Sequence, residues 1–246
     1  MAMQHDAVKP YGQKKGSKKE QVSQMFDNIA PYYDGLNRFL SMGVDRSWRK
    51  KAIRMVADAK PNTLLDVATG TADVALALSD KLPDAQITGV DIAAKMLEIG
   101  QKKIDKAGKG NKIELVLGDS ENLPFADNTY DAVTVAFGVR NFENLEKGLV
   151  EIKRVLRPGG RLLVLEFSKP TIFPFKQLFN AYFKYLLPLI GKLTSKDPKA
   201  YQYLYESVQA FPDGKQFVDI LGKTGYKNQT CIPLSLGICS IYQAQK

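Results

Sequence analysis

The sequence has 246 residues, of which 44% are hydrophobic, and a formal net charge of +9 at pH 7. This length suits one large domain, and the hydrophobic share excludes a chain that is disordered throughout. The excess of Lys and Arg is compatible with nucleic acid, an anionic membrane or an acidic partner and does not choose among them.

Residues 1–20 are expected to form a flexible, basic tail. They include five Lys and no apolar stretch of the kind that a signal peptide needs. The only histidine, His5, lies in this tail, which excludes histidine-based catalytic triads and argues against a histidine metal site. Cys231 and Cys239 fit neither a disulfide framework nor a zinc pattern, so we expect no metal and a reducing, cytoplasmic location.

Residues 21–60 are expected to form N-terminal helices that precede the sheet. Apolar residues recur every three or four positions between residues 21 and 40, and Pro31 is expected to break this segment into two pieces. Asp45 is a candidate N-cap for the next helix, over residues 46–58.

From residue 63 onward, short apolar runs alternate with helical patterns. The predicted strands cover residues 63–68, 86–92, 112–118, 130–137 and 161–167. The predicted helices between them cover residues 73–82, 93–107 and 145–156. This alternation implies right-handed crossovers, and hence an α/β fold with a Rossmann-like, doubly wound, mostly parallel sheet.

The pattern changes after Pro170. Residues 171–212 are expected to form a helical insertion that covers the domain or acts as a lid. A further helix is expected over residues 215–224, and residues 226–244 are expected to form two antiparallel strands that extend the sheet. Residues 21–246 are therefore predicted to be a single domain.

The turn in LLDVATGTADVA (64–75) is the first candidate ligand site, because doubly wound sheets bind ligands beyond the carboxyl ends of their strands. It has neither GxGxxG nor GK[ST], so it does not match the loops that hold phosphates. Gly70 allows the backbone to approach a ligand, and the carboxylates of Asp66 and Asp73 favour a cationic ligand. The alternative is that Asp73 only stabilises the dipole of the following helix.

Two further strand ends carry carboxylates. Asp91 ends the strand ITGVD, at a place where an acidic residue commonly accepts hydrogen bonds from a ribose diol. Asp119 and Ser120, in GDSENLPF, follow the next strand, where an adenine amino group would be read. Acidic residues at three successive strand ends favour a ligand site over three unrelated helix caps.

Four segments, LDVATGTAD, GVDIAAKML, GDSENLPF and LRPGGRLLVLEFSKP, resemble class I S-adenosylmethionine-dependent methyltransferases. FDNIAPYYDGLNRFLSMGVDRSWRK, FADNTYDAVTVAFGVRN and VLEFSKP are similar to the quinone C-methyltransferases of ubiquinone and menaquinone synthesis, and this similarity extends over roughly residues 22–244.

The resemblance implies that S-adenosylmethionine is the cofactor, whose positive charge and lack of phosphate suit an acidic turn. The family's cofactor positions fall on Thr71, Asp91, Asp119 and Ser120, and we add Asp66 and Gly70 as candidates. Two positions depart from the pattern: Ala72 stands where a glycine often follows the threonine, and Ala136 stands where some relatives have serine.

The resemblance further implies methyl transfer to a ring carbon of a reduced, prenylated demethylquinone. A hydroquinone O–H resembles a phenol, with a pKa of about 10, and its deprotonation activates the adjacent ring carbon. The candidate catalytic residues are Tyr33, Asn37, Arg140 and Asn141. Arg140 is expected to stabilise the phenolate, because its own pKa exceeds about 12. A water held by Asn141 or Tyr33 is expected to accept the proton.

Each of these residues also has a structural interpretation. Tyr33 is a core aromatic if its helix packs on the sheet, Arg140 pairs with Glu143 or Glu166, and Asn141 caps the next helix.

Demethylmenaquinol is the favoured substrate. A benzoquinol of the ubiquinone pathway, alone or as a second substrate, remains the main alternative. A nucleic-acid methyltransferase is disfavoured, because neither [DN]PP[YFW] nor a nucleophilic Cys follows the fourth strand, so we expect no nucleic-acid partner. A small-molecule O-methyltransferase and a cofactor-binding scaffold without activity also remain open.

The aromatic-rich segment 173–193 is a poor transmembrane span, because it contains several Lys and Pro188. Three roles are possible for this segment. It could be an interfacial helix that makes peripheral contact with the inner face of the membrane, or a lid over the prenyl chain. It could also be an ordinary packed helix or a homodimer interface.

Overall fold

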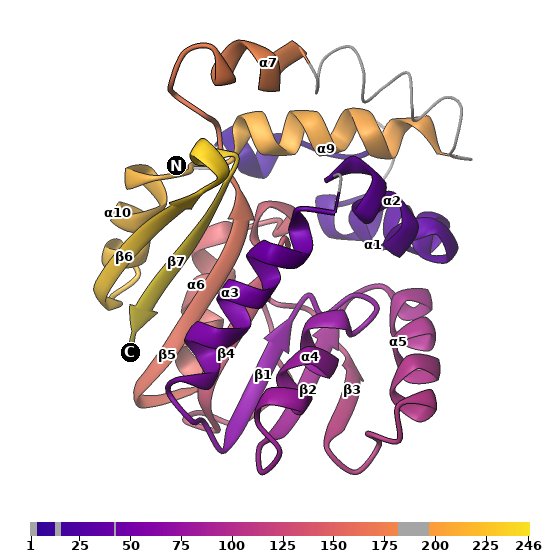
Figure 1. The fold of residues 1–246 in the computed structure, drawn as a ribbon, viewed down its shortest axis with the longest axis vertical. Helices are drawn as coiled ribbons and strands as arrows, with labels where there is room; N and C mark the ends of the chain where they lie inside the picture. Colours follow the sequence, from indigo (N-terminus) through magenta and orange to yellow (C-terminus); the bar gives the residue numbers. More distant parts are fainter. Residues whose placement is uncertain (1–3, 13–15, 42, 182–196) are drawn as a thin grey trace.

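The computed structural model describes residues 4–12, 16–41, 43–181 and 197–246 (Figure 1). Within these residues the strands form one seven-stranded sheet in the order β3-β2-β1-β4-β5-β7-β6. The pairs among β1 to β5 are parallel, and β7 runs antiparallel between β5 and β6. The predicted α/β fold, with its doubly wound and mostly parallel sheet, is confirmed.

The strands lie close to their predicted positions. Their bounds are β1 Thr63–Val67, β2 Gln86–Asp91, β3 Ile113–Leu117, β4 Tyr130–Ala136, β5 Leu156–Phe167, β6 Lys227–Leu234 and β7 Cys239–Gln245. Only β5 differs by more than two residues at its start. The predicted antiparallel pair at the end of the chain is also present, joined through the short 3-10 helix Ser235–Gly237.

The helices follow the predicted alternation. Their bounds are α1 Lys18–Ile29, α2 Tyr33–Leu40, α3 Asp45–Ala57, α4 Asp73–Lys81, α5 Ala94–Lys106, α6 Leu145–Val155, α7 Phe175–Ala181, α9 Pro198–Ala210 and α10 Lys215–Lys223. Pro31 lies in a 3-10 turn between α1 and α2, as its missing N–H requires. The predicted N-cap at Asp45 is wrong: Asp45 is inside α3, where its carboxylate accepts a hydrogen bond from Ser41 Oγ at 2.7 Å.

The sheet is covered by helices on both faces, because its strands present apolar side chains to both (Figure 1). Leu65 and Val133 pack in a core with α6 and α10 on one face. Leu64 and Ala132, one residue earlier in each strand, pack in a core with α3 and α4 on the other. The carboxyl ends of the parallel strands are left for the connections, and α1, α2, α7 and α9 lie over that end.

The N-terminal residues that the structure describes do not form a solvated tail. Gln4–Ala7 form a 3-10 helix in which His5 is only 1% exposed. The Nε2 atom of His5 donates to the Arg140 carbonyl oxygen at 2.5 Å, and buried Lys18 donates to the His5 carbonyl oxygen at 2.9 Å. Burial lowers the pKa of His5 to about 4, so the imidazole is neutral near pH 7.

The predicted insertion is helical where it is described. Phe179 of α7 packs against Tyr201 and Val208 of α9, above the sheet in Figure 1. Residues 182–196 lie outside the described residues, so the helix predicted over 173–193 is seen only as far as Ala181. Among the described residues, no helix has the length and apolar character that a membrane span requires.

Candidate functional site

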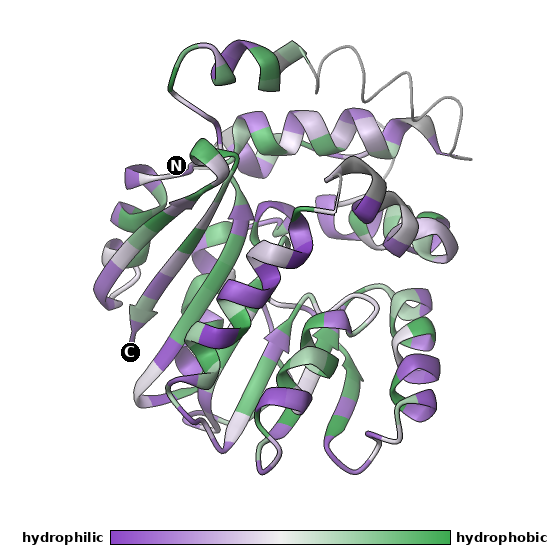
Figure 2. Cartoon of the chain, in the orientation of Figure 1, coloured by the Kyte–Doolittle hydropathy of each residue, from purple (hydrophilic) through white to green (hydrophobic). Residues whose placement is uncertain are grey.

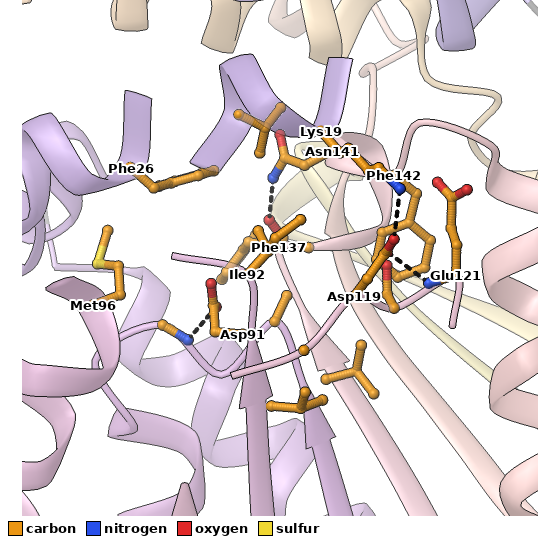
Figure 3. A pocket seen from close by; sticks show the side chains of 18 of the residues that line it. Lys19, Phe26, Asp91, Ile92, Met96, Asp119, Glu121, Phe137, Asn141 and Phe142 are labelled. Atoms are coloured by element: carbon orange, nitrogen blue, oxygen red, sulfur yellow. Dashed lines mark hydrogen bonds and ion pairs between the residues drawn. The ribbon is translucent and has the colours of Figure 1, made fainter. Parts of the chain in front are cut away.

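A cavity lies at the carboxyl ends of β1, β2, β3 and β4 (Figure 3). We call it the first cavity. Four predicted cofactor residues line it: Gly70, Asp91, Asp119 and Ser120. Its other lining includes Lys19, Phe26, Tyr33, Ile92, Met96, Phe137, Asn141 and Phe142.

The turn after β1 is fixed to the end of β2. Gly70 has φ +58°, a left-handed conformation that favours glycine, and its N–H donates to Asp91 Oδ2 at 2.8 Å. Ala72 also has a positive φ, +62°, although it carries a side chain. Both positions of the turn therefore have left-handed backbone geometry, although only one of them is a glycine.

Asp91 is the carboxylate of the cavity floor. Its two oxygens accept hydrogen bonds from the Gly70 and Ala93 N–H groups, at 2.8 and 2.9 Å. Burial raises the pKa of Asp91, and these backbone hydrogen bonds oppose the rise by stabilising the charged form. Because each carboxylate oxygen has a second lone pair, Asp91 can still accept hydrogen bonds from a ligand diol.

Asp119 and Ser120 form the opposite wall. Asp119 Oδ1 accepts a hydrogen bond from the Glu121 N–H at 2.9 Å, and its Oδ2 pairs with Lys19 of α1 at 3.0 Å (Figure 3). The apolar side chains of Ile92 and Met96 also line the cavity.

Asp66 does not line the first cavity. Successive residues of a strand point to opposite sides, and Val67 faces the cavity while Asp66 is buried beneath the turn. Its carboxylate accepts hydrogen bonds from the hydroxyl groups of Thr69 and Thr134, both at 2.7 Å. Burial raises its pKa to about 6. These hydrogen bonds hold the turn to β4, and a direct ligand contact of Asp66 stays a prediction.

The Thr71 side chain also points away from the first cavity. Its hydroxyl group donates to Asp34 of α2 at 2.7 Å and accepts a hydrogen bond from Lys103 of α5 at 2.8 Å. Lys103 also pairs with Asp73 at 2.6 Å, and Arg49 approaches the same carboxylate at 3.4 Å. The charge of Asp73 is thus balanced by protein side chains, and this polar cluster ties α2 to the turn.

A second cavity adjoins the first. The two cavities share Phe26, Tyr33 and Asn141 as walls. All four predicted catalytic residues line the second cavity: Tyr33, Asn37, Arg140 and Asn141. The remaining walls are formed by Met25, Ile29 and by Ala200, Tyr201, Tyr203 and Leu204 of α9. The structure therefore brings residues of α2 together with residues of the segment after β4, and residues of α9 complete the wall.

Arg140 is held in place by a buried ion pair. Its Nη1 donates to Glu166 Oε1 at 2.7 Å and to the Phe137 carbonyl oxygen at 2.6 Å. Glu166 is fully buried, so this pair is the structural alternative that the sequence left open for Arg140. The Nε atom of Arg140 has no hydrogen-bond partner within the described part of the chain. One N–H donor of this fixed guanidinium is therefore still available.

Asn141 stands between the two cavities. Its Nδ2 donates to the Phe137 carbonyl oxygen at 3.3 Å, as Figure 3 shows, and this contact fixes which end of the amide is the donor. The Oδ1 atom is buried and has no partner among the residues that the structure covers. It is therefore an acceptor without a donor, at the wall that separates the two cavities.

Sequence reasoning missed several lining residues. Ile92 and Met96 follow Asp91 closely in GVDIAAKML, so their position beside a strand end was a usable signal. Tyr201 and Tyr203 gave no such signal, because their place in the site depends on how α9 packs over the sheet. Within the described ranges, no group of three His, Cys, Asp or Glu side chains is arranged to hold a metal ion.

Comparison with known proteins adds family information to this geometry. The sequence profile of the ubiE/COQ5 methyltransferase family matches residues 14–246. A demethylmenaquinone methyltransferase of Bacteroides fragilis is 47% identical over 241 residues, which are 98% of this chain and 98% of the relative. A ubiquinone/menaquinone biosynthesis C-methyltransferase UbiE of Geotalea daltonii is 44% identical over 230 residues, covering 93% of this chain and 97% of the relative.

The fold also matches solved structures. A SAM-dependent methyltransferase of Thermotoga maritima superposes with a TM-score of 0.63 over 91% of this chain and 99% of that chain, at 20% identity. At this identity the similarity concerns the fold alone. It agrees with the doubly wound, mostly parallel sheet of this chain.

Proposed function

The chain belongs to the ubiE/COQ5 methyltransferase family, and we propose that it transfers a methyl group from S-adenosylmethionine to a ring carbon of demethylmenaquinol, giving menaquinol. The relatives with 44–47% identity whose names mention demethylmenaquinone or menaquinone support this substrate class. The observation that carries the proposal is the junction at Tyr33 and Asn141, where the first cavity meets the cavity that contains all four predicted catalytic residues.

The first cavity fits the cofactor in its chemistry. Asp91 is suited to accept hydrogen bonds from the ribose diol, and Asp119 with Ser120 to accept from the adenine amino group beside Ile92 and Met96. When bound, S-adenosylmethionine supplies a methyl group that the ring carbon takes as the carbon–sulfur bond breaks with its electron pair left on sulfur, while the hydrogen of that ring carbon leaves as a proton.

The residues of the second cavity prepare the quinol ring. The guanidinium of Arg140 has a free Nε–H, which donates to the ring oxygen as that oxygen becomes negative. Asn141 Oδ1 accepts the ring O–H, or holds the water that takes its proton. The apolar walls, among them Phe26 and Leu204, exclude bulk water and strengthen these polar contacts.

The exposed apolar surface near α7 suits a substrate with a prenyl tail. Ile172, Phe173 and Leu178 are 56%, 77% and 61% exposed, beside the exposed Lys176. Figure 2 shows hydrophobic stretches in α7 and in the segment before it. We infer that this face rests on the inner surface of the membrane, where apolar side chains enter the lipid and Lys176 meets anionic headgroups.

Vesicles of anionic lipid test this placement. The wild type is expected to sediment with them, and the double variant Phe173→Asp, Leu178→Asp is expected to stay in the supernatant with its turnover of a short-chain quinol retained. Wild-type protein that does not bind the vesicles but forms a dimer, and a double variant that is monomeric, would assign the face to a homodimer interface instead.

Methyl transfer from labelled S-adenosylmethionine tests the function itself. The acceptors are a short-chain demethylmenaquinol and a short-chain demethylbenzoquinol, both kept reduced, and total tRNA. Label in the naphthoquinol supports the proposal. Label only in the benzoquinol would reject the substrate while keeping the reaction, and label in the RNA would reject both.

A further inference from the structure

Tyr203 of α9 is a buried residue whose hydroxyl group has no visible use in the fold. Its side chain is only 2% exposed and lines the second cavity together with Arg140 and Asn141. The Tyr203 hydroxyl group has no hydrogen-bond partner among the described residues. Buried polar atoms without a partner are rare in folded proteins, because each loses its hydrogen bonds to water without replacement.

Other buried tyrosines in the described part of the chain do have partners. Tyr226 donates to the Leu149 carbonyl oxygen at 2.9 Å, and the Tyr242 hydroxyl oxygen accepts a hydrogen bond from the Gly214 N–H at 2.8 Å. Both residues are buried in the main core and line neither the first nor the second cavity. The fold therefore satisfies these tyrosine hydroxyl groups where they serve structure, and Tyr203 differs by lining a cavity.

The phenol of Tyr203 keeps its proton near neutral pH and can donate a hydrogen bond there. Burial raises the pKa of Tyr203 above its usual value, the charge of Glu166 raises it further, and Arg140 opposes the rise. A protonated phenol can donate one hydrogen bond and accept others. Three residues of the second cavity therefore have an unpaired polar group: Tyr203 and Arg140 each have a donor, the O–H and the Nε–H, and Asn141 has an acceptor, Oδ1.

We infer that Tyr203 contacts the substrate: its O–H donates a hydrogen bond to a ring oxygen of the quinol and stabilises the phenolate that forms there. This inference rests on the proposed function, which supplies the ring oxygen. The donor and acceptor pattern matches a quinol, since a ring hydroxyl group can donate to Asn141 while a developing phenolate accepts from Tyr203 and Arg140. No proton is transferred from Tyr203, which remains a phenol throughout.

The test compares Tyr203→Phe with Tyr226→Phe, because each variant removes one buried hydroxyl group and nothing else. Tyr203→Phe is expected to lower kcat for demethylmenaquinol by about tenfold, as expected for loss of one donor to a developing anion, with an unchanged or higher Tm. Tyr226→Phe is expected to lower Tm, because the Leu149 carbonyl oxygen loses its donor, with kcat unchanged.

A pH profile separates a substrate contact from a packing effect. Tyr203 stabilises the ionised ring oxygen, so its removal raises the pKa of the bound quinol, and the rise of kcat with pH should move to higher pH in Tyr203→Phe. Turnover within about twofold of wild type, or a Tm loss like that of Tyr226→Phe with an unmoved pH profile, overturns the inference. A wild-type chain that does not methylate the quinol overturns the proposed function, and the Tyr203 contact with it.

Discussion

The two cavities of this protein are built in opposite ways. In the first cavity, the polar groups already bind one another: Asp91 accepts from Gly70 and Ala93, and Asp119 accepts from Glu121 and pairs with Lys19. In the second cavity, polar atoms are buried without partners. Of the five such side-chain atoms in the described residues, three belong to residues that line it: Arg140 Nε, Asn141 Oδ1 and Tyr203 Oη.

In the proposed function, the first cavity binds the cofactor and the second holds the residues that act on the quinol ring. The first cavity is made by loops at the ends of neighbouring strands, and its geometry is fixed by backbone hydrogen bonds before any ligand enters. The second cavity lies between helices from distant parts of the chain, and each unpaired atom costs about 1–3 kcal/mol until a ligand satisfies it. Such atoms are retained where they will interact with a group that becomes charged during the reaction.

Removing Arg140 should have the largest effect, because it breaks the buried ion pair that holds the wall of the second cavity. Arg140→Met leaves Glu166 buried and uncompensated, which should lower the free energy of unfolding by about 3–5 kcal/mol. Turnover should also fall by about a hundredfold or more, through loss of the donor to the phenolate. Urea unfolding and quinol methylation measure the two effects.

A double variant separates these effects of Arg140. Arg140→Met with Glu166→Gln removes the uncompensated charge, so stability should largely return while turnover stays low. As a control, Arg157→Met removes a half-exposed partner of Asp131 and should change stability by less than about 1 kcal/mol. Full turnover in the double variant would show that Arg140 serves the fold alone.

Asp66→Asn should raise the free energy of unfolding, whereas Arg140→Met should lower it. The folded-state pKa of Asp66, about 6, lies above the usual 3.8, so the protonated form stabilises the fold. That contribution is fully present below about pH 4 and is lost as the pH rises through 6. Asn keeps one acceptor and can donate to the other threonine hydroxyl group. At pH 8 the variant should gain on the order of 2–3 kcal/mol.

Cofactor affinity shows whether Asp66 belongs to the first cavity or beneath it. The Asp66→Asn variant should bind S-adenosylhomocysteine within about twofold of wild type, because the side chain does not line the cavity. A tenfold or greater loss would restore the direct contact that the sequence suggested. Stability that depends on pH as in wild type would instead place the titration on another residue.

Local sequence patterns predicted residues of the first cavity for a physical reason. Asp91, Asp119 and Ser120 follow strands directly, and parallel strands end at one edge of a sheet, so local patterns place these residues together. Asp66 does not line the first cavity, because alternation along β1 turns it away from the side that Val67 faces, and its contact with a ligand stays a prediction.

The second cavity depends on packing that no local pattern encodes. Tyr33 and Arg140 were found only because their surrounding segments resemble a family. Tyr203 lies on a helix whose position is set by contacts with α7 and the N-terminal helices. His5 lies in a polar segment that looked solvated, yet backbone carbonyls and Lys18 provide the partners that allow its burial.

Asp91→Ala should weaken cofactor binding in the first cavity and leave the second cavity unchanged. The variant loses the acceptor for the ribose diol and leaves the Gly70 N–H without its partner, so affinity for S-adenosylhomocysteine should fall at least tenfold, or about 1.4 kcal/mol. Calorimetric titration measures this loss. Asp27→Ala is the control, because Asp27 accepts from the Lys95 N–H outside the first cavity. Equal affinity in the two variants would remove Asp91 from the cofactor site.

His5→Ala should have the smallest effect, and it tests whether the second cavity needs support from the N-terminal segment. His5 donates to the Arg140 carbonyl oxygen, so its loss should loosen the backbone that presents Arg140 and Asn141 and lower kcat by about threefold to tenfold with cofactor affinity unchanged. Lys9→Ala, which removes an exposed contact to the Gly16 carbonyl oxygen, should leave kcat unchanged.

The pH dependence identifies the neutral imidazole as the stabilising form. The folded-state pKa of His5, about 4, lies below the usual 6.5, so its contribution is present above pH 6.5 and is lost as the pH falls through 4. Amide exchange in residues 4–12 should therefore accelerate in wild type between pH 6.5 and 4, after correction for the intrinsic rate. In His5→Ala it should be fast throughout. Strong protection of this segment in both proteins at every pH would mean that other contacts dock it and that Arg140 does not depend on His5.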